Sequence, residues 1–205
     1  MESTVDRIED TVIDVYQRHG LAWAELRSDS LVEGPGLDRF CTLLLAGSAV
    51  LDTGCGSGLP IARELIRRGF DVTGVDATPT MLALFRHNLP GVSAKLADMR
   101  QLALVRRFAG LLAWDSFLHL SPEDQRVMFC RFQAHASPSA ALMFTSGNVK
   151  GNAIGDLEGD PLYHGSLDPE EYRTLLDRAG FDVVDHVVED PTCGDRTIWL
   201  SRQRA

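Results

Sequence analysis

The chain has too little positive charge and too few long apolar runs to suggest a nucleic-acid or membrane partner. Its 205 residues include 20 Lys and Arg against 29 Asp and Glu, which gives a net charge of −9. A nucleic-acid-binding face would need a basic stripe, and the arginines are scattered along the sequence. No apolar run approaches the ~20 residues that span a bilayer. We therefore expect neither nucleic acid nor membrane as a partner.

Paired cysteines and targeting segments are missing as well. The four cysteines form no CxxC pair and have no metal-like spacing with the six histidines. We interpret them as free thiols in a reducing cytoplasm, and we expect no metal. Residues 1–4 are polar and acidic, unlike a secretory signal. The sequence has no internal repeat, and its length suits a single domain over residues 1–205.

The most informative segment is a glycine-rich turn that follows a short apolar run. Residues 49–51 suit a buried strand, Asp52 closes it, glycines follow at 54, 56 and 58, and Pro60 can begin a helix. Such glycines allow a tight turn and let a ligand lie against bare backbone. A dinucleotide fingerprint has the spacing G-x-G-x-x-G, whereas this turn has G-x-G-x-G. Asp52 would also repel a pyrophosphate, whereas it would stabilise a cationic ligand.

Acidic residues end three successive predicted strands. Asp52, Asp76 and Asp98 each follow an apolar run. In an open parallel sheet, ligands bind outside the carboxyl ends of the strands. Asp76 is placed to accept both hydroxyls of a ribose, and Asp98 to accept the exocyclic amine of adenine beside the adaptable side chain of Met99. Three carboxylates in series predict a nucleoside-binding edge of the sheet.

The remaining patterns predict alternating strands and helices behind an N-terminal helical layer. One-sided apolar residues predict a helix over 3–19 that stops at Gly20, and another over 37–46. Further strands are expected at 71–75, 93–97, 108–114, 140–145, 181–188 and 197–201. Further helices are expected at 60–68, from 78 onward, at 122–136 and at 168–179. Residues 148–164 are glycine-rich without a period, and we expect a loop, which either acts as a lid or serves as a structural strut.

The motif Asp52–Gly58, with Asp76 and Asp98–Met99, resembles the class I S-adenosylmethionine-dependent methyltransferases, closest to their small-molecule members. The resemblance covers residues 49–201 and includes the segment 108–120. It implies an α/β fold, a three-layer Rossmann-like sandwich. Its mostly parallel seven-stranded sheet has the order 3-2-1-4-5-7-6, with strand 7 antiparallel. Residues 1–47 would form a helical cap and residues 48–205 the core.

The resemblance also implies a reaction and a cofactor site. The cofactor is S-adenosylmethionine, and a methyl group moves to an O, N or C atom of a small-molecule acceptor. Asp52 and the glycine turn would hold the methionine part, Asp76 the ribose, and Asp98 with Met99 the adenine. The implied cofactor contacts are Asp52, Gly54, Cys55, Gly56, Gly58, Asp76, Ala77, Asp98, Met99 and Trp114. The chain lacks both the Asn/Asp-Pro-Pro-Tyr motif of DNA methyltransferases and the metal ligands of the catechol enzymes, which favours a metal-independent reaction on a small molecule.

Residues on the acceptor side are open to two interpretations. His119 follows the fourth strand and is the candidate general base, because histidine titrates near neutral pH; the alternative is a structural histidine at a helix entry. Asp115 is a candidate for binding the acceptor. Tyr163 and His164 end the glycine-rich segment and either close over the substrate or belong to the core.

The N-terminal region and the overall function also leave alternatives. Tyr16, Trp23 and Arg27 either cap the pocket or pack as a flanking helical layer. A nucleotide-dependent oxidoreductase is a second function, against which Asp52 and the glycine spacing argue. A non-catalytic module that keeps the fold and the cofactor is a third. The sequence fixes neither the acceptor nor the oligomeric state, for which a homodimer is one alternative.

Overall fold

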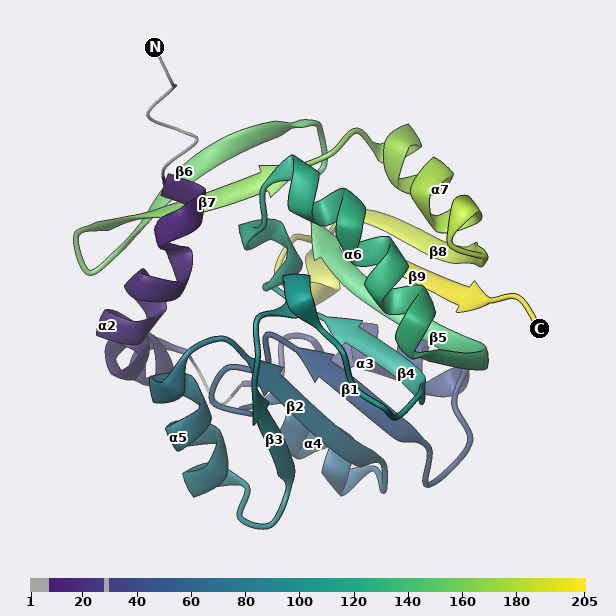
Figure 1. Cartoon of the computed structure of the whole chain (residues 1–205), viewed down its shortest axis with the longest axis horizontal. Helices are drawn as coiled ribbons and strands as arrows, with labels where there is room; N and C mark the ends of the chain where they lie inside the picture. The colour runs from purple at the N-terminus through teal and green to yellow at the C-terminus, as the bar shows by residue number, and fades with distance from the viewer. Residues whose placement is uncertain (1–7, 28–29) are drawn as a thin grey trace.

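A computed structural model describes residues 8–27 and 30–205 and contains a seven-stranded sheet between two helical layers (Figure 1). The strand order is β3-β2-β1-β4-β5-β9-β8. β9 is antiparallel to β5 and β8, and the other neighbours pair in parallel. With the separate β6–β7 pair set aside, this is the predicted order, and the predicted fold class is confirmed. The strands of this sheet are β1 (Ala49–Thr53), β2 (Asp71–Asp76), β3 (Ser93–Leu96), β4 (Phe108–Ala113), β5 (Ala136–Ser146), β8 (Phe181–Asp190) and β9 (Arg196–Gln203).

The central strands are apolar on both faces because each face is covered by helices. Successive side chains of a strand point to opposite sides. Val50 and Leu112 therefore pack with α3, α4 and α5, while Leu51 and Leu111 pack with α6 and α7. The helices are α2 (Val12–Leu26), α3 (Gly34–Thr42), α4 (Ile61–Arg67), α5 (Pro79–Asn88), α6 (Pro122–His135) and α7 (Pro169–Arg178), with short 3-10 turns η1 (Glu9–Thr11), η2 (Met99–Gln101), η3 (Phe117–His119) and η4 (Pro191–Cys193).

Helix α2 continues through Gly20, so the predicted stop there is wrong. A Cβ on Gly20 would lie 3.1 Å from Thr80 Cγ2 of α5. The glycine therefore lets two helices approach closely and does not end the first. The predicted start of this helix, residues 3–7, lies outside the described residues. The helix predicted at 37–46 begins earlier, at Gly34, with Pro35 in its first turn.

The segment predicted as a loop is a β-hairpin, so that prediction is wrong. β6 (Gly151–Leu157) and β7 (Asp160–Ser166) pair antiparallel outside the large sheet. Their two-residue turn, Glu158–Gly159, has φ values of 54° and 88°, as tight hairpin turns require. Figure 1 shows α2 between α5 and this hairpin. α2 and the hairpin share an apolar cluster of Val12, Val15, Leu157, Leu162 and Tyr163.

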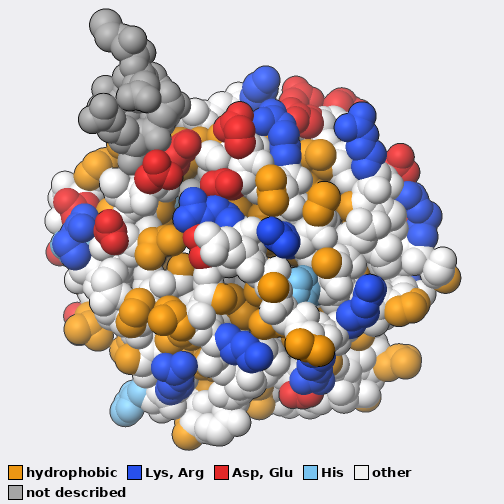
Figure 2. Space-filling view, in the orientation of Figure 1, with side chains coloured by type: hydrophobic (Ala, Val, Ile, Leu, Met, Phe, Trp, Pro, Cys, Tyr) orange, Lys and Arg blue, Asp and Glu red, His pale blue; other side chains and the backbone are white. Residues whose placement is uncertain are grey.

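Charges of both signs are mixed on the face of the molecule that Figure 2 shows. Figure 2 shows basic and acidic side chains interspersed on one face, with apolar side chains between them and no broad basic patch. Within residues 8–27 and 30–205, none of the helices combines the length and apolar character that crossing a bilayer requires.

Candidate functional site

A cavity of about 1120 Å³, counting its open mouth, lies at the carboxyl ends of β1, β2 and β4 and is covered by α2. The predicted residues that line it are Tyr16, Trp23, Arg27, Asp52, Gly54, Cys55, Gly56, Gly58, Asp76, Ala77, Asp98, Met99, Trp114, Asp115 and His119. Thr78, Arg100 and Ser116 also line it, and the sequence analysis did not assign them. Each lies one or two residues beyond a predicted acidic residue, which was the available signal.

The glycine turn, Gly54–Gly58, packs directly on the segment after β4. Gly54 has a φ of 73°, and a Cβ there would lie 2.3 Å from Ser116 Cβ, so no side chain fits. Ser116 Oγ donates to the carbonyl oxygen of Thr53 at 2.7 Å. The N–H of Gly54 donates to the carbonyl oxygen of Val75 at 2.7 Å. Both neighbouring strands therefore fix the turn at the cavity wall.

Asp76, at the end of β2, is held by three hydrogen bonds. Its Oδ2 accepts the N–H of Gly56 at 2.9 Å, and its Oδ1 accepts the N–H and the hydroxyl of Thr78 at 2.9 and 2.7 Å. Burial raises the pKa of Asp76, and these hydrogen bonds oppose the rise. The carboxylate thus joins the glycine turn to the start of α5 while it lines the cavity.

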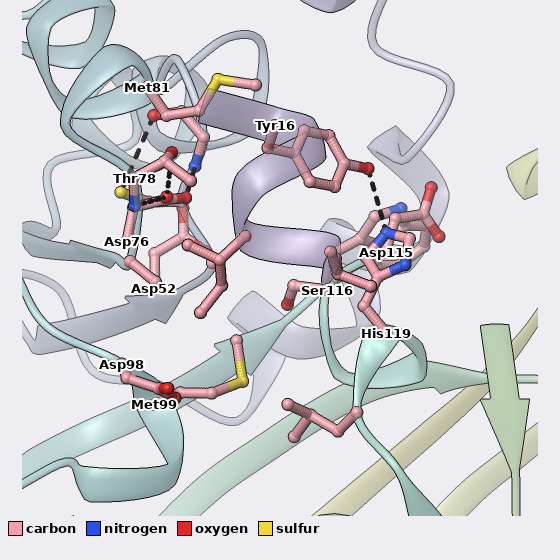
Figure 3. Close-up of a pocket in the computed structure, with 18 of the residues that line it drawn as sticks. Tyr16, Asp52, Asp76, Thr78, Met81, Asp98, Met99, Asp115, Ser116 and His119 are labelled. Carbon is pink, nitrogen blue, oxygen red and sulfur yellow. Dashed lines mark hydrogen bonds between the residues drawn. The ribbon is translucent and has the colours of Figure 1, made fainter. Parts of the chain in front are cut away.

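Asp52 differs from Asp76 because its carboxylate has no donor. It is 4% exposed, and no group among the described residues donates a hydrogen bond to it. Burial, together with the negative charge of Asp76, raises the pKa of Asp52 to about 7. A buried carboxylate without a partner is unfavourable. Because it faces the cavity (Figure 3), this site fits a ligand that brings a positive charge.

The carboxylate of Asp98 is already paired with the guanidinium of Arg100 in this structure. Arg100 Nη2 donates to its Oδ2 at 2.6 Å, and the N–H of Arg100 donates to its Oδ1 at 2.9 Å. Arg100 also contacts Asp124 at 3.3 Å. A carboxylate offers about four lone-pair positions, so Asp98 keeps acceptor capacity beside Arg100. The Met99 side chain reaches the glycine turn, since its Cε would lie 3.2 Å from a Cβ on Gly54.

Tyr16 and His119 form a hydrogen-bonded pair on the side of the cavity opposite Asp52 and Asp76 (Figure 3). Tyr16 Oη lies 3.0 Å from His119 Nε2, and His119 Nδ1 lies 2.8 Å from the backbone oxygen of Tyr163. A carbonyl oxygen can only accept, so Nδ1 carries the proton, Nε2 is bare, and Tyr16 donates to it. Burial lowers the pKa of His119 to about 4 and raises that of Tyr16. The imidazole is therefore neutral at physiological pH.

Asp115 shares this end of the cavity. Directly after β4, it adopts a left-handed φ of 46°. Thr145 Oγ1 accepts its N–H at 2.8 Å, and Arg196 Nε contacts both carboxylate oxygens at 2.9 Å. After burial, the charge of Asp115 is the next cause of the raised pKa of Tyr16. A strained conformation that neighbours hold in place is typical of functional sites.

Tyr163 and His164 lie behind the pair and outside the cavity lining. Tyr163 is fully buried between the hairpin and α2, and its hydroxyl donates to Asn152 Oδ1 at 2.8 Å. The His164 ring lies against the His119 ring, with centroids 4.8 Å apart and planes inclined by 42°. Tyr163 therefore has the core position that the sequence left as its alternative. In the described part of the chain, no three His, Cys, Asp or Glu side chains are arranged to hold a metal ion.

Comparison with known proteins gives matches to methyltransferases. Residues 50–139 match a family model described as a methyltransferase domain. The chain is 38% identical over 90 residues to magnesium-protoporphyrin O-methyltransferase of Rhodobacter capsulatus, covering 41% of this chain and 39% of that protein. It is 24% identical over 169 residues to arsenite methyltransferase of Halobacterium salinarum, covering 77% and 43%. The chain thus spans about two fifths of the length of these curated relatives.

Solved structures share the whole fold at low identity. The 1,6-didemethyltoxoflavin N1-methyltransferase of Burkholderia thailandensis, crystallised with 1,6-didemethyltoxoflavin and S-adenosylhomocysteine, has a TM-score of 0.78 at 18% identity, covering 100% of this chain and 92% of that one. An amino pentose methyltransferase of Micromonospora echinaspora, bound to S-adenosylmethionine, has a TM-score of 0.70 at 21% identity, covering 91% and 97%. These likenesses concern the fold.

Proposed function

We propose that this chain, which has the class I methyltransferase fold and matches a methyltransferase domain over residues 50–139, is an S-adenosylmethionine-dependent methyltransferase acting on a small molecule. The observation that carries the proposal is the buried, unpartnered carboxylate of Asp52 beside the glycine turn. An ammonium group on the ligand would supply the missing cation. The pyrophosphate of a dinucleotide would instead add negative charge next to Asp52 and Asp76, which argues against a nucleotide-dependent oxidoreductase.

The cavity offers a place for each part of the cofactor. We assign the ammonium group to Asp52, the ribose hydroxyls to Asp76, and the adenine to the Asp98–Met99 segment. When bound, the cofactor supplies an electrophilic methyl group on a sulfonium. The glycine turn, Gly54–Gly58 with Cys55, would lie against the methionine part, with Ala77 and Trp114 as further contacts.

Arg27 adds a cation that suits the cofactor's carboxylate. It pairs with the buried carboxylate of Glu33 and lines the cavity. It follows Trp23 by one helical turn, and the Trp23 ring would lie 3.6 Å from a Cβ on Gly56. Because Arg27 lines the same cavity as the glycine turn, its guanidinium is our candidate partner for the carboxylate of the methionine part.

Relatives support a small-molecule acceptor without fixing its reacting atom. By name, one is an O-methyltransferase for magnesium-protoporphyrin, another is an arsenite methyltransferase, and a structural neighbour is a 1,6-didemethyltoxoflavin N1-methyltransferase. The acceptor of this chain is therefore best inferred from its own cavity.

Calorimetric titration tests the proposal. S-adenosylmethionine or S-adenosylhomocysteine should bind with micromolar affinity to protein treated with a chelator, and a reduced nicotinamide nucleotide should give no heat. Absence of heat and of a thermal shift at millimolar ligand would refute the proposal. Binding without label transfer from methyl-labelled cofactor to any metabolite would leave a non-catalytic binding module.

A further inference from the structure

We propose that the acceptor is an amine, methylated as the free base with its nitrogen beside the Tyr16 hydroxyl. This inference rests on the proposed methyl transfer and names the acceptor class for the same cavity. The Tyr16–His119 pair carries it, because the backbone of β7 fixes the proton positions in that pair.

The direction of the hydrogen bond between Tyr16 and His119 determines what the pair offers to a ligand. The Tyr163 carbonyl holds the proton of His119 on Nδ1, and the bare Nε2 receives the proton of the Tyr16 hydroxyl. Tyr16 therefore has no proton left to donate into the cavity. Its oxygen lone pairs remain, so the pair presents a hydrogen-bond acceptor that suits an N–H group.

The same contacts leave His119 a poor general base. Both ring nitrogens are occupied, and the ring is enclosed by Tyr16 from α2 and His164 from β7. Asp115, paired with Arg196, lies nearby and contributes charge to both Tyr16 and His164. Burial, and further the charge of His164, lower the pKa of His119 to about 4. Taking a proton from a phenol-like hydroxyl of pKa ~10 would thus be unfavourable by a factor on the order of 10⁶.

An amine needs no base in the transfer step. The nitrogen lone pair forms the new bond to the methyl carbon, the carbon–sulfur bond breaks, and its electron pair stays on sulfur as the thioether of S-adenosylhomocysteine. The product keeps its proton as an ammonium, whose pKa lies near 10, and loses it to water later. A hydroxyl acceptor would become a strongly acidic protonated ether unless a base removed its proton. The positive charge that develops on nitrogen would face the Tyr16 oxygen and the Asp115 carboxylate, which favours the amine.

Labelling identifies the acceptor atom directly. Enzyme, cofactor carrying a ¹³C-methyl group and a metabolite extract are incubated, and the carbon chemical shift of the labelled product separates N-methyl from O-, S- and C-methyl. We expect N-methyl product. Label on oxygen, sulfur or carbon would overturn the amine proposal and leave the methyltransferase standing. No label on any product, with cofactor binding intact, would instead refute the proposed transfer.

Two substitutions of His119 distinguish a positioning residue from a base. In His119→Gln, the amide can still donate to the Tyr163 carbonyl and accept from Tyr16, whereas His119→Leu can do neither. With the acceptor found by labelling, we expect kcat within about 10-fold of wild type for the first and a loss of about 100-fold for the second. If His119 were the base, both variants would lose 10²–10⁴-fold. Melting temperature and cofactor affinity of both variants control for folding.

A third measurement needs no catalysis. Nitrogen NMR of the ring of His119 in the ligand-free protein should show the neutral form with Nδ1 protonated, unchanged between pH 5 and 9. Titration of this ring near its ordinary pKa of ~6.5 would overturn the fixed polarity on which the amine proposal depends.

Discussion

A buried carboxylate without a donor raises the free energy of the empty protein, and a cationic ligand can remove that cost. Burial and the charge of Asp76 keep the pKa of Asp52 at about 7. An ammonium placed beside Asp52 favours the ionised form and lowers its pKa. Binding and proton release are then linked, so the pH dependence of cofactor affinity reports on this one residue.

We expect cofactor affinity to rise with pH up to about pH 7 and to level off above it. Below pH 7 Asp52 must lose a proton before it can pair, so affinity should fall by up to ~10-fold per pH unit. Calorimetry with S-adenosylhomocysteine from pH 5.5 to 9 measures the curve. A flat acidic limb would remove Asp52 from the ammonium site.

Replacing Asp52 with Asn should stabilise the ligand-free protein and lower its affinity for the cofactor. The folded-state pKa is raised, so the wild-type residue contributes stability below its unfolded pKa and loses that contribution as pH rises through about 7. At pH 8 Asp52→Asn should therefore unfold with a free energy about 2–4 kcal/mol higher than wild type.

Urea unfolding at pH 8 and at pH 4.5 checks this expectation, because the difference between the two proteins should shrink at the lower pH. Equal differences at both pH values would mean that Asn acts through packing and not through the lost charge.

Residues differ in how far the sequence could reveal them. The positions of Asp52, Asp76 and Asp98 at the cavity could be predicted because each lies at or just after the end of a strand, and strand ends are visible in the local sequence. The Tyr16–His119 contact joins residues 103 positions apart, and nothing in the local pattern of either residue indicates the other. The tautomer of His119 depends on one backbone carbonyl of β7, which periodicity cannot report.

At the scale of elements, the hairpin was missed because its sequence resembles a loop. Residues of β6 are mostly exposed and include two glycines, so the strand lacks an apolar alternation. The turn offered only a partial signal: Gly159 suits the second position of a two-residue turn, but Glu158 stands where Asn or Asp is usual. Gly20 was misread for the opposite reason, since a helix-breaking residue serves a tertiary contact with α5.

Tyr163 should matter for stability, because it joins the hairpin to α2. Tyr163→Ala removes a fully buried ring and should lower the unfolding free energy by about 3–5 kcal/mol. Tyr163→Phe is the matched control: it loses only the hydroxyl that donates to Asn152, which costs about 0.5–1.5 kcal/mol. Chemical denaturation measures both values. Near-wild-type stability of the alanine variant would show that the hairpin is not anchored there.

Hydrogen exchange tests whether the hairpin and α2 are coupled through Tyr163. In the alanine variant, amides of β7 and of the N-terminal half of α2 should lose protection together, since one cluster holds both elements. Loss of protection in β7 alone would contradict this coupling.

At the scale of the whole molecule, cofactor binding should stabilise the fold without help from a metal. Free ligand at 100 times its Kd adds about 2.7 kcal/mol by mass action. For a chain of this size, that gain corresponds to a rise in melting temperature of about 5–10 °C. Differential scanning fluorimetry with and without a chelator measures the shift, and dependence on added divalent cations would contradict the prediction.

The sheet order was implied by the family resemblance that the strand-end motifs carry, while the acceptor end depends on contacts between distant segments. Our cofactor assignments fall mainly on residues 52–99, at the ends of β1, β2 and β3. The acceptor end combines α2, the segment after β4 and the support of β7. The cofactor residues lie close together in the sequence, whereas the acceptor residues do not. Sequence patterns therefore identified more of the cofactor residues.

The β6–β7 hairpin pairs with no strand of the large sheet, so it can change length or sequence without disturbing the register of that sheet. In laboratory evolution, the hairpin and α2 are best randomised together, because they pack in one apolar cluster. Libraries confined to the hairpin and α2 should yield variants with new acceptor preferences and an unchanged cofactor site.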